Sequence, residues 1–270
     1  MEILVATGGA AHSTRALSFA ARLAEQAQVP LTILTIIKYE DQEPEAESIL
    51  IGAKALIQSI APSVTVKGVT RIGHPAEEIL AEIESSPYAV AVLGEKQHHG
   101  LITRFVIGST AQRVVEHSQC PVILVKGTIS GPIQRLLICD SGLPNDSVVD
   151  RLRQQFPLLF RVVKRSTVLH VIQDEMIPSD DEDVQIIDGD SVEGRLLHHD
   201  LGCLGDEGVE CTPRIRHGNI VEEIVAEVTS KEYQLVVIGA HRGSGWRRIL
   251  LDDIANRLIL KLDCPMLVVR

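Results

Sequence analysis

The chain contains one pattern of residues twice. Val90–Gly94 leads on to Cys120–Val125, and Leu235–Gly239 leads on to Cys264–Val269. Each copy has an aliphatic strand pattern that ends in glycine, then a helical pattern, then a strand that begins with Cys-Pro. The glycines at positions 94 and 239 are 145 residues apart, and the cysteines at 120 and 264 are 144 apart. A duplication of this length predicts two similar domains in one chain.

The two predicted domains, residues 1–130 and 131–270, need cores made of aliphatic side chains. The 270 residues are 45% hydrophobic but only 3% aromatic. Aliphatic runs alternate with segments of helical period, which is typical of a parallel sheet with helices on both faces. We therefore expect an α/β fold in which each domain is a mostly parallel five-stranded sheet flanked by helices. The segment 127–132, with two glycines and a proline, is the predicted linker.

Hydrophobic periods and proline positions predict the individual elements. The expected strands of the first half cover residues 3–7, 31–37, 64–71, 88–93 and 121–126. Its expected helices cover residues 13–28, 46–60, 75–84 and 108–118. The expected strands of the second half cover residues 135–139, 166–172, 210–216, 234–238 and 265–270. Its expected helices cover residues 145–159, 191–204, 220–230 and 247–261.

Charge and apolar patterning exclude several classes of protein. The formal net charge is −10, which disfavours binding to nucleic acid because a polyanion needs a basic surface. No apolar run reaches the roughly 18 residues of a membrane span, and the N-terminus has no pattern of a secretory signal. Five cysteines do not indicate a disulfide framework. We expect a cytoplasmic protein that binds neither nucleic acid nor membrane.

The segments Gly108–Val115 and Cys120–Val125 are similar to the helix start and the Cys-Pro-Val final strand of universal stress proteins. Each half resembles one domain of that family, and the whole chain resembles a tandem member. The resemblance implies a Rossmann-type fold of the adenine nucleotide alpha hydrolase-like class. It also implies a role in the stress response, and many members of the family bind ATP.

The ATP-binding pattern of the family combines glycines with a helix start. One glycine follows strand four, a second comes three residues later, and Gly-Ser or Gly-Thr opens a helix after nine more residues. An Asp at the end of strand one completes the site. Glycines let the backbone approach phosphates, and the N–H groups of a helix start attract anions.

The first half keeps part of this pattern. The matching residues are Gly94, Gly100 in the loop, Gly108, Ser109 and Thr110. Gln97 stands where the second glycine is expected, and the loop is one residue longer than in the family. The place of the Asp falls to Thr7 or to Gly8, depending on the alignment.

The second half keeps a different part. Asp140 closes its first strand, and Gly239 follows its fourth. However, Arg242 replaces the second glycine, and Asp252 with Asp253 stands at the expected Gly-Ser. Carboxylates suit a helix N-terminus but repel phosphate. We interpret this pair as helix-capping residues.

Two hypotheses about function follow from this comparison. In the first, ATP with Mg²⁺, or a related adenine nucleotide, binds in the first half and the second half is degenerate. In the second, neither cleft binds nucleotide, and the protein is a regulatory or scaffold protein that acts through protein–protein contacts. No catalytic residue is indicated, so any enzymatic activity would be at most a slow ATPase.

A group of metal-ligand residue types occurs in the second half: His198, His199, Asp200, Cys203 and Cys211. Their spacing matches none of the strong Cys/His zinc patterns. We interpret them as polar residues of a helix or loop and predict no metal site.

The final strands of the two halves, Pro121–Lys126 and Pro265–Arg270, are the predicted pairing edges. Exposed aliphatic edges need a partner strand, and the resemblance implies pairing through this strand. We expect the two halves to pair with each other in this way. The same argument allows a homodimer of whole chains.

Overall fold

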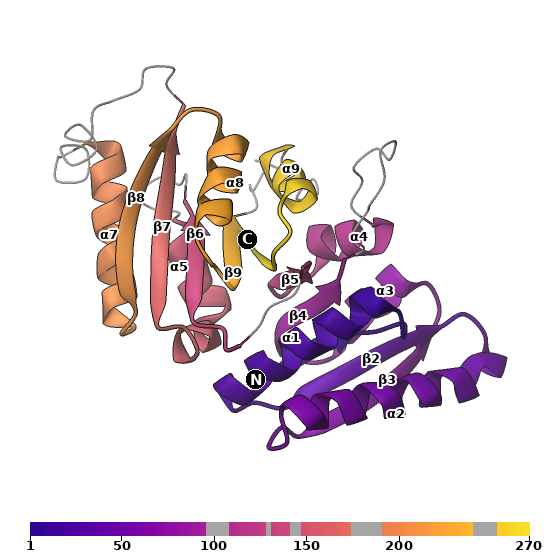
Figure 1. Cartoon of the computed structure of the whole chain (residues 1–270). Coiled ribbons are helices and arrows are strands. Elements are labelled where there is room, and N and C mark those ends of the chain that lie inside the picture. The colour runs from indigo at the N-terminus through magenta and orange to yellow at the C-terminus, as the bar shows by residue number, and fades with distance from the viewer. Residues whose placement is uncertain (96–107, 128–130, 141–146, 174–190, 240–252) are drawn as a thin grey trace.

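The computed structural model describes residues 1–95, 108–127, 131–140, 147–173, 191–239 and 253–270 (Figure 1). Within these residues, ten strands form one sheet in the order β3-β2-β1-β4-β5-β10-β9-β6-β7-β8. The strands of the first half are β1 (Glu2–Ala6), β2 (Leu31–Ile37), β3 (Val66–Ile72), β4 (Tyr88–Gly94) and β5 (Val122–Val125). Those of the second half are β6 (Arg135–Cys139), β7 (Arg165–Ile172), β8 (Glu210–His217), β9 (Leu235–Gly239) and β10 (Met266–Val269).

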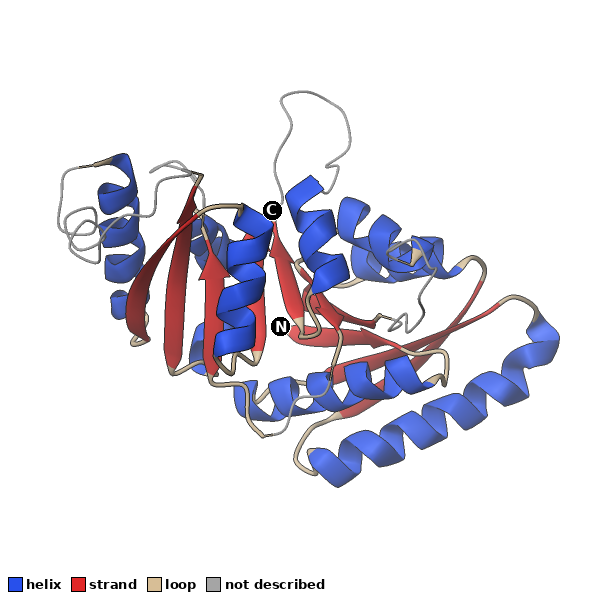
Figure 2. Ribbon diagram, turned by 45° about the horizontal axis from the view of Figure 1, so that its top comes forward, coloured by secondary structure: helices blue, strands red, loops and turns tan. Residues whose placement is uncertain are grey.

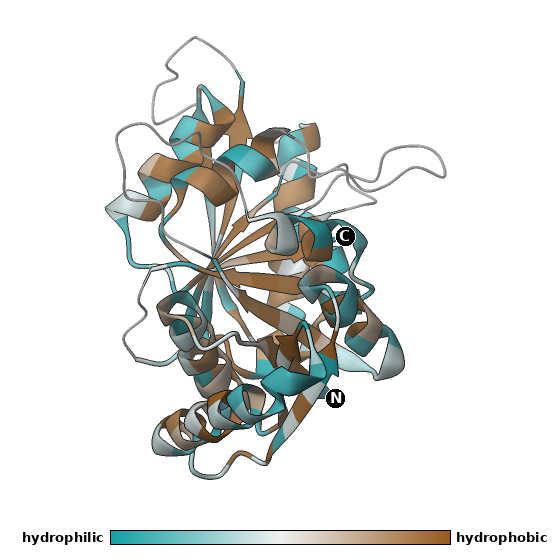
Figure 3. Ribbon diagram, turned by 90° about the vertical axis from the view of Figure 1, so that its right-hand side faces the viewer, coloured by the Kyte–Doolittle hydropathy of each residue, from teal (hydrophilic) through white to brown (hydrophobic). Residues whose placement is uncertain are grey.

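The described helices cover both faces of this sheet (Figure 2). Their bounds are α1 (Ala11–Ala27), α2 (Glu43–Ile60), α3 (Pro75–Ser85), α4 (Ser109–His117), α5 (Val148–Gln155), α7 (Val192–Asp206), α8 (Ile220–Ser230) and α9 (Asp253–Lys261). Helices α1, α2, α5 and α7 pack into one apolar core, and α3, α4, α8 and α9 pack into the other. The strands between the two layers are largely hydrophobic (Figure 3). None of the described helices is both long and apolar enough to cross a membrane.

The sequence predicted this fold class correctly. Neighbouring strands within each half run parallel, as the alternation of strands and helices requires. One predicted helix, 145–159, is wrong at its C-terminal end. There α5 ends at Gln155, and a 3₁₀ turn covers Pro157–Arg161. Proline cannot continue an α-helix, because it lacks an N–H group and disfavours the helical conformation of the preceding residue.

The two halves meet where β5 and β10 pair in antiparallel fashion. Val122 lies opposite Val268, and Leu124 lies opposite Met266. Two basic side chains cross this junction in opposite directions. Lys126, after β5, donates a hydrogen bond to the carbonyl of Ile259 in α9, and Arg270, after β10, donates to the carbonyl of Val115 in α4. Each of these side chains reaches the last turn of a helix in the other half of the chain. The helix dipole favours a positive charge at this end of a helix.

The outer edges of the sheet are β3 and β8. An unpaired edge strand invites pairing with another chain, and charged residues or proline prevent it. Strand β3 carries Lys67 and Arg71, and β8 carries Arg214, Arg216 and the proline at position 213. Both edges therefore discourage extension of the sheet.

A buried carboxylate ties three elements of the first half together. Glu82 of α3, only 5% exposed, accepts hydrogen bonds from Arg71 Nε of β3 at 2.7 Å and from the Tyr88 hydroxyl of β4 at 2.7 Å. A buried charge is tolerated when it is paired and hydrogen-bonded. The trio therefore fixes how α3 crosses from β3 to β4.

The second half repeats this trio 145 positions later. Glu227 of α8 is fully buried. It accepts hydrogen bonds from Arg216 Nη2 at 2.7 Å and from the Tyr233 hydroxyl at 2.8 Å. Lys231 adds an ion pair at 3.1 Å. The same crossover is thus fixed by the same chemistry in both halves.

The Glu227 network predicts a specific loss of stability in acid. Burial acts to raise the pKa of Glu227, but hydrogen bonds from Tyr233, Arg216 and Lys231 outweigh it and lower the pKa from 4.5 to about 2. The resulting stability is fully present above pH 4.5 and is lost as the pH falls toward 2. We expect Glu227→Gln to lower the free energy of unfolding by about 2–4 kcal/mol at pH 7 and to flatten its decline between pH 4.5 and 2.

Urea titrations at a series of pH values measure both effects. Glu222→Gln is the matched control, because Glu222 is an exposed residue of the same helix. A pH dependence that is the same in Glu227→Gln and in the wild type would contradict the assignment.

Candidate functional site

The main cleft of the first half lies at the carboxyl ends of the strands. It is lined by the ends of β1, β2 and β4 and by the starts of α1, α3 and α4. Strands β1 and β4 are neighbours, and the helices that follow them pack on opposite faces of the sheet. This is a topological switch point, where open parallel sheets bind ligands. The cleft volume of about 530 Å³ is in the range of small-molecule sites.

Most of the residues that the sequence singled out in the first half line this one cleft. They are Thr7, Gly8, Gly94, Gly108, Ser109 and Thr110. Gly100 and Gln97 lie outside the described residues, as do Arg242 and Asp252 of the second half. Asp253 is the first residue of α9.

The register of the sheet decides which residue takes the place of the family Asp. The N–H of Asp140 donates to the carbonyl of Leu169 in the strand next to β6, at 3.0 Å. The N–H of Thr7 donates in the same way to Leu34 in the strand next to β1, at 2.9 Å. Thr7, and not Gly8, is therefore the counterpart of Asp140. The Thr7 hydroxyl accepts a hydrogen bond from the N–H of Gly9 at 3.2 Å.

Gly94 is required by packing, whether or not a ligand is bound. A Cβ atom at this position would lie 2.3 Å from the carbonyl oxygen of His12 in the first turn of α1. The start of α1 therefore lies directly over the end of β4. Only a residue without a side chain permits this approach.

Glu95 is a residue of the cleft that the sequence analysis did not identify. It follows β4 directly and is 4% exposed. Its Oε1 atom accepts a hydrogen bond from the N–H of Gly108, the N-cap residue of α4, at 3.0 Å. A carboxylate of the protein thus occupies a position that a phosphate oxygen would take at this helix start. The acidic residue directly after the strand-four glycine was the available signal in the sequence.

Lys126 partly balances the charge of Glu95. Burial lowers the pKa of Lys126, and the negative charges of Glu95 and Asp263 oppose that shift. The cleft therefore contains a buried carboxylate with a buried cation in its neighbourhood.

The corresponding carboxylate of the second half serves a helix start as well. Asp140 Oδ2 accepts a hydrogen bond from the N–H of Val148, the first residue of α5, at 2.6 Å. Asp200 of α7 is fully buried nearby. Burial and then the negative charge of Asp140 raise the pKa of Asp200 to about 8. The negative charge of Asp140, buried beside Asp200, disfavours a phosphate here.

A parallel sheet with a cleft at its switch point places the chain among Rossmann-like α/β proteins. The chain belongs to the universal stress protein family, whose sequence model matches residues 1–126 and again residues 161–270. The universal stress protein YxiE of Bacillus subtilis (strain 168) is 27% identical in an alignment of 146 residues that covers 46% of this chain and 98% of YxiE.

The fold is also seen in a solved structure that matches the whole chain. A universal stress protein from Archaeoglobus fulgidus DSM 4304 is similar with a TM-score of 0.70 and 17% identity, over 100% of this chain and 98% of that one. A universal stress protein from Archaeoglobus fulgidus in complex with dAMP matches 47% of this chain and 98% of its own, with a TM-score of 0.39 and 23% identity.

The contact between Gly94 and His12 predicts the effect of a single methyl group. We expect Gly94→Ala to lower the free energy of unfolding by about 1–3 kcal/mol, because the first turn of α1 must move away from β4. Gly52→Ala in α2 is the control, since a Cβ atom there meets nothing within 4 Å. That substitution should raise stability by roughly 0.5–1 kcal/mol. Chemical denaturation measures the change in the free energy of unfolding for both variants. If Gly94→Ala leaves it unchanged, packing does not require this glycine, and the close approach of a phosphate would be the remaining reason for it.

Proposed function

We propose that this chain is a stress-response protein that binds an adenine nucleotide in the cleft of its first domain, residues 1–130. The second domain, residues 131–270, is degenerate and does not bind nucleotide. The observation that carries the proposal is the convergence of two helix starts, those of α1 and α4, on one cleft at the switch point. Helix starts supply N–H donors and positive potential for phosphate.

The two helix starts differ in whether a carboxylate of the protein already balances their positive potential. The start of α4 already has the Glu95 carboxylate at the N–H of Gly108. Helix α1 begins after Ala10, whose side chain cannot cap it, and its first turn has no acidic residue. The start of α1 is therefore the better place for phosphate. The hydroxyls of Ser109 and Thr110 line the same cleft and offer further polar contacts.

Glu95 should limit the affinity for nucleotide. A phosphate near α4 must either displace this carboxylate or accept its repulsion, which is strong in a partly desolvated site. Among the described residues that line the cleft, Glu95 is the acidic one. Mg²⁺, if it accompanies ATP, would be held chiefly by the phosphates.

Calorimetric titration with ATP, with and without Mg²⁺, tests the proposal. We expect Glu95→Gln to bind ATP about tenfold more tightly than the wild type, because the substitution removes the charge and keeps an acceptor for the Gly108 N–H. Gly108→Asp should weaken binding, because it adds a negative charge at the start of α4, in the same cleft as the phosphate. Gly108→Asn is its matched control, since both residues are good N-caps and only one is charged.

The second candidate function is that of a scaffold or regulatory protein without nucleotide. The hydrogen bond between Glu95 and Gly108 favours it, because the protein itself fills an anion position. No heat of binding at millimolar ATP in both the wild type and Glu95→Gln would overturn the nucleotide proposal and leave this candidate. A homodimer of whole chains stays a prediction. It would need another surface, since β5 and β10 already pair with each other.

A further inference from the structure

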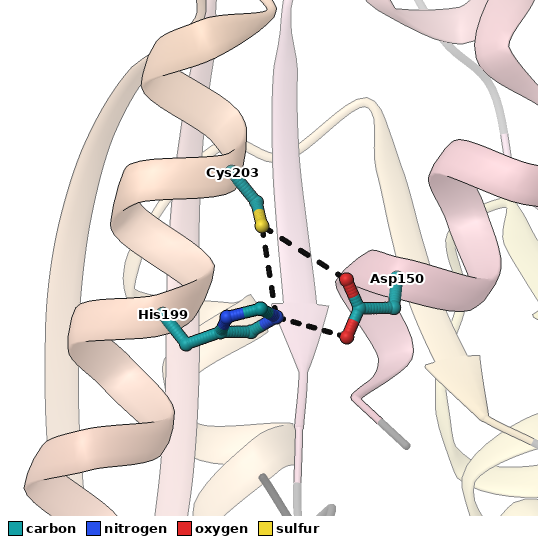
Figure 4. A group of neighbouring side chains, drawn as sticks. All are labelled: Asp150, His199 and Cys203. Atoms are coloured by element: carbon teal, nitrogen blue, oxygen red, sulfur yellow. Dashed lines mark hydrogen bonds and ion pairs between the residues drawn. The ribbon is translucent and has the colours of Figure 1, made fainter. Parts of the chain in front are cut away.

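Three side chains that can bind metals converge between α5 and α7 in the second half (Figure 4). His199 and Cys203 are four residues apart on α7, so they lie on the same face of that helix. Asp150 faces them from the first turn of α5. His199 Nε2 is 2.9 Å from Asp150 Oδ2 and 3.6 Å from Cys203 Sγ, and Cys203 Sγ is 3.9 Å from Asp150 Oδ1.

These separations resemble those around a tetrahedral metal ion. With the usual bond lengths of Zn²⁺ to sulfur, nitrogen and oxygen, neighbouring ligand atoms are about 3.4–3.6 Å apart. The observed separations are 2.9, 3.6 and 3.9 Å, and the first and the last involve different oxygens of the Asp150 carboxylate. One ligand atom from each residue lies within 4.8 Å of the other two, so small side-chain rotations would bring the three atoms to the bond lengths of one Zn²⁺ ion.

The chemistry of the three groups selects the class of metal. A thiolate and an imidazole are soft or borderline ligands that suit Zn²⁺, whereas Mg²⁺ and Ca²⁺ prefer sites made of oxygen. We propose that Asp150, His199 and Cys203 bind one Zn²⁺ ion. The fourth tetrahedral position faces solvent on the side of His199, whose side chain is 39% exposed, and takes a water molecule.

The surroundings of the site both oppose and support a cation. Burial raises the pKa of the Cys203 thiol, and the charge of Arg153 opposes that rise. The positive charge of Arg153 disfavours a second cation, but Glu207 pairs with it at 3.1 Å and offsets it. Zn²⁺ would displace the thiol proton, as it does in other cysteine sites.

The bound ion would link two helices that follow different strands. Helix α5 follows β6 and α7 follows β7, and both cover the same face of the sheet. A metal bond between them would stabilise this part of the second half. The site is independent of the nucleotide proposal, because no residue of it belongs to the first half.

No metal site was predicted here from the sequence, because the spacing of these residues matches none of the strong Cys/His zinc patterns. Of the five residues named there, the structure brings His199 and Cys203 together. The third ligand, Asp150, is 49 positions before His199 and comes from another helix. The spacing of His199 and Cys203 on a predicted helix was the signal for the first two ligands.

Titration of the metal-free, reduced protein with Co²⁺ tests the proposal, because Co²⁺ replaces Zn²⁺ and its absorption reports the ligands. We expect visible bands of tetrahedral intensity and a near-ultraviolet band from thiolate to cobalt, both abolished by one equivalent of Zn²⁺. Cys203→Ser should lose the thiolate band. His199→Gln and Asp150→Asn should weaken binding about tenfold or more.

His198→Gln and Cys211→Ser are the matched controls and should keep the wild-type spectrum. His198 is exposed and adjacent on α7, and Cys211 lies on β8. Asp150 and His199 are partly exposed, so their variants test the site even if Cys203→Ser fails to fold. Two results would overturn the proposal: a wild-type spectrum equal to that of aqueous Co²⁺, or loss of the thiolate band in Cys211→Ser but not in Cys203→Ser. Either result would mean that Asp150, His199 and Cys203 do not together bind a metal ion. The ion pair between His199 and Asp150 would then be the only interaction assigned to them.

Discussion

A buried carboxylate held by an arginine and a tyrosine organises each half of the molecule. Removing the arginine would leave the buried carboxylate with less compensation for its charge, which is strongly unfavourable. The edge strand, the crossover helix and β4 or β9 must therefore come together in one arrangement. In the first half this places the end of β4 beside β1. Gly94 and Glu95 then reach the starts of α1 and α4, so the network that stabilises the fold also positions the cleft.

In each half a carboxylate accepts a hydrogen bond from an N–H group at a helix start. The strand that this carboxylate follows differs between the two halves. In the first half Glu95 follows β4 and serves α4, and in the second half Asp140 follows β6 and serves α5. The position of Asp140 is taken by Thr7 in the first half. The position 145 residues after Glu95 is Ala240 in the sequence. The two halves therefore place their carboxylates at different positions of the same arrangement of strands and helices.

The sequence was sufficient for the fold because the fold depends on local patterns. Aliphatic runs, helical periods and proline positions indicated each strand and most helices. The end of α5 was missed although Pro157 was visible, because the helical period continues beyond it into the 3₁₀ turn. The contacts of the site were harder to predict from the sequence. The contact of Gly94 with His12, the hydrogen bond of Glu95 to Gly108 and the meeting of Asp150 with His199 all join residues that are distant in the sequence. The spacing of residues within one segment does not reveal the contacts of Gly94 with His12 or of Asp150 with His199, and it gives only a weak signal for Glu95.

The antiparallel pair of β5 and β10 has a consequence for assembly. When two separate chains pair through such strands, the complex falls apart on dilution and like can pair with like. Here both strands belong to one polypeptide, so the linker holds them at a high effective concentration that does not depend on the amount of protein. Every molecule therefore joins one first half to one second half in fixed stoichiometry. The two halves can then diverge in sequence, because neither half has to pair with a second copy of itself.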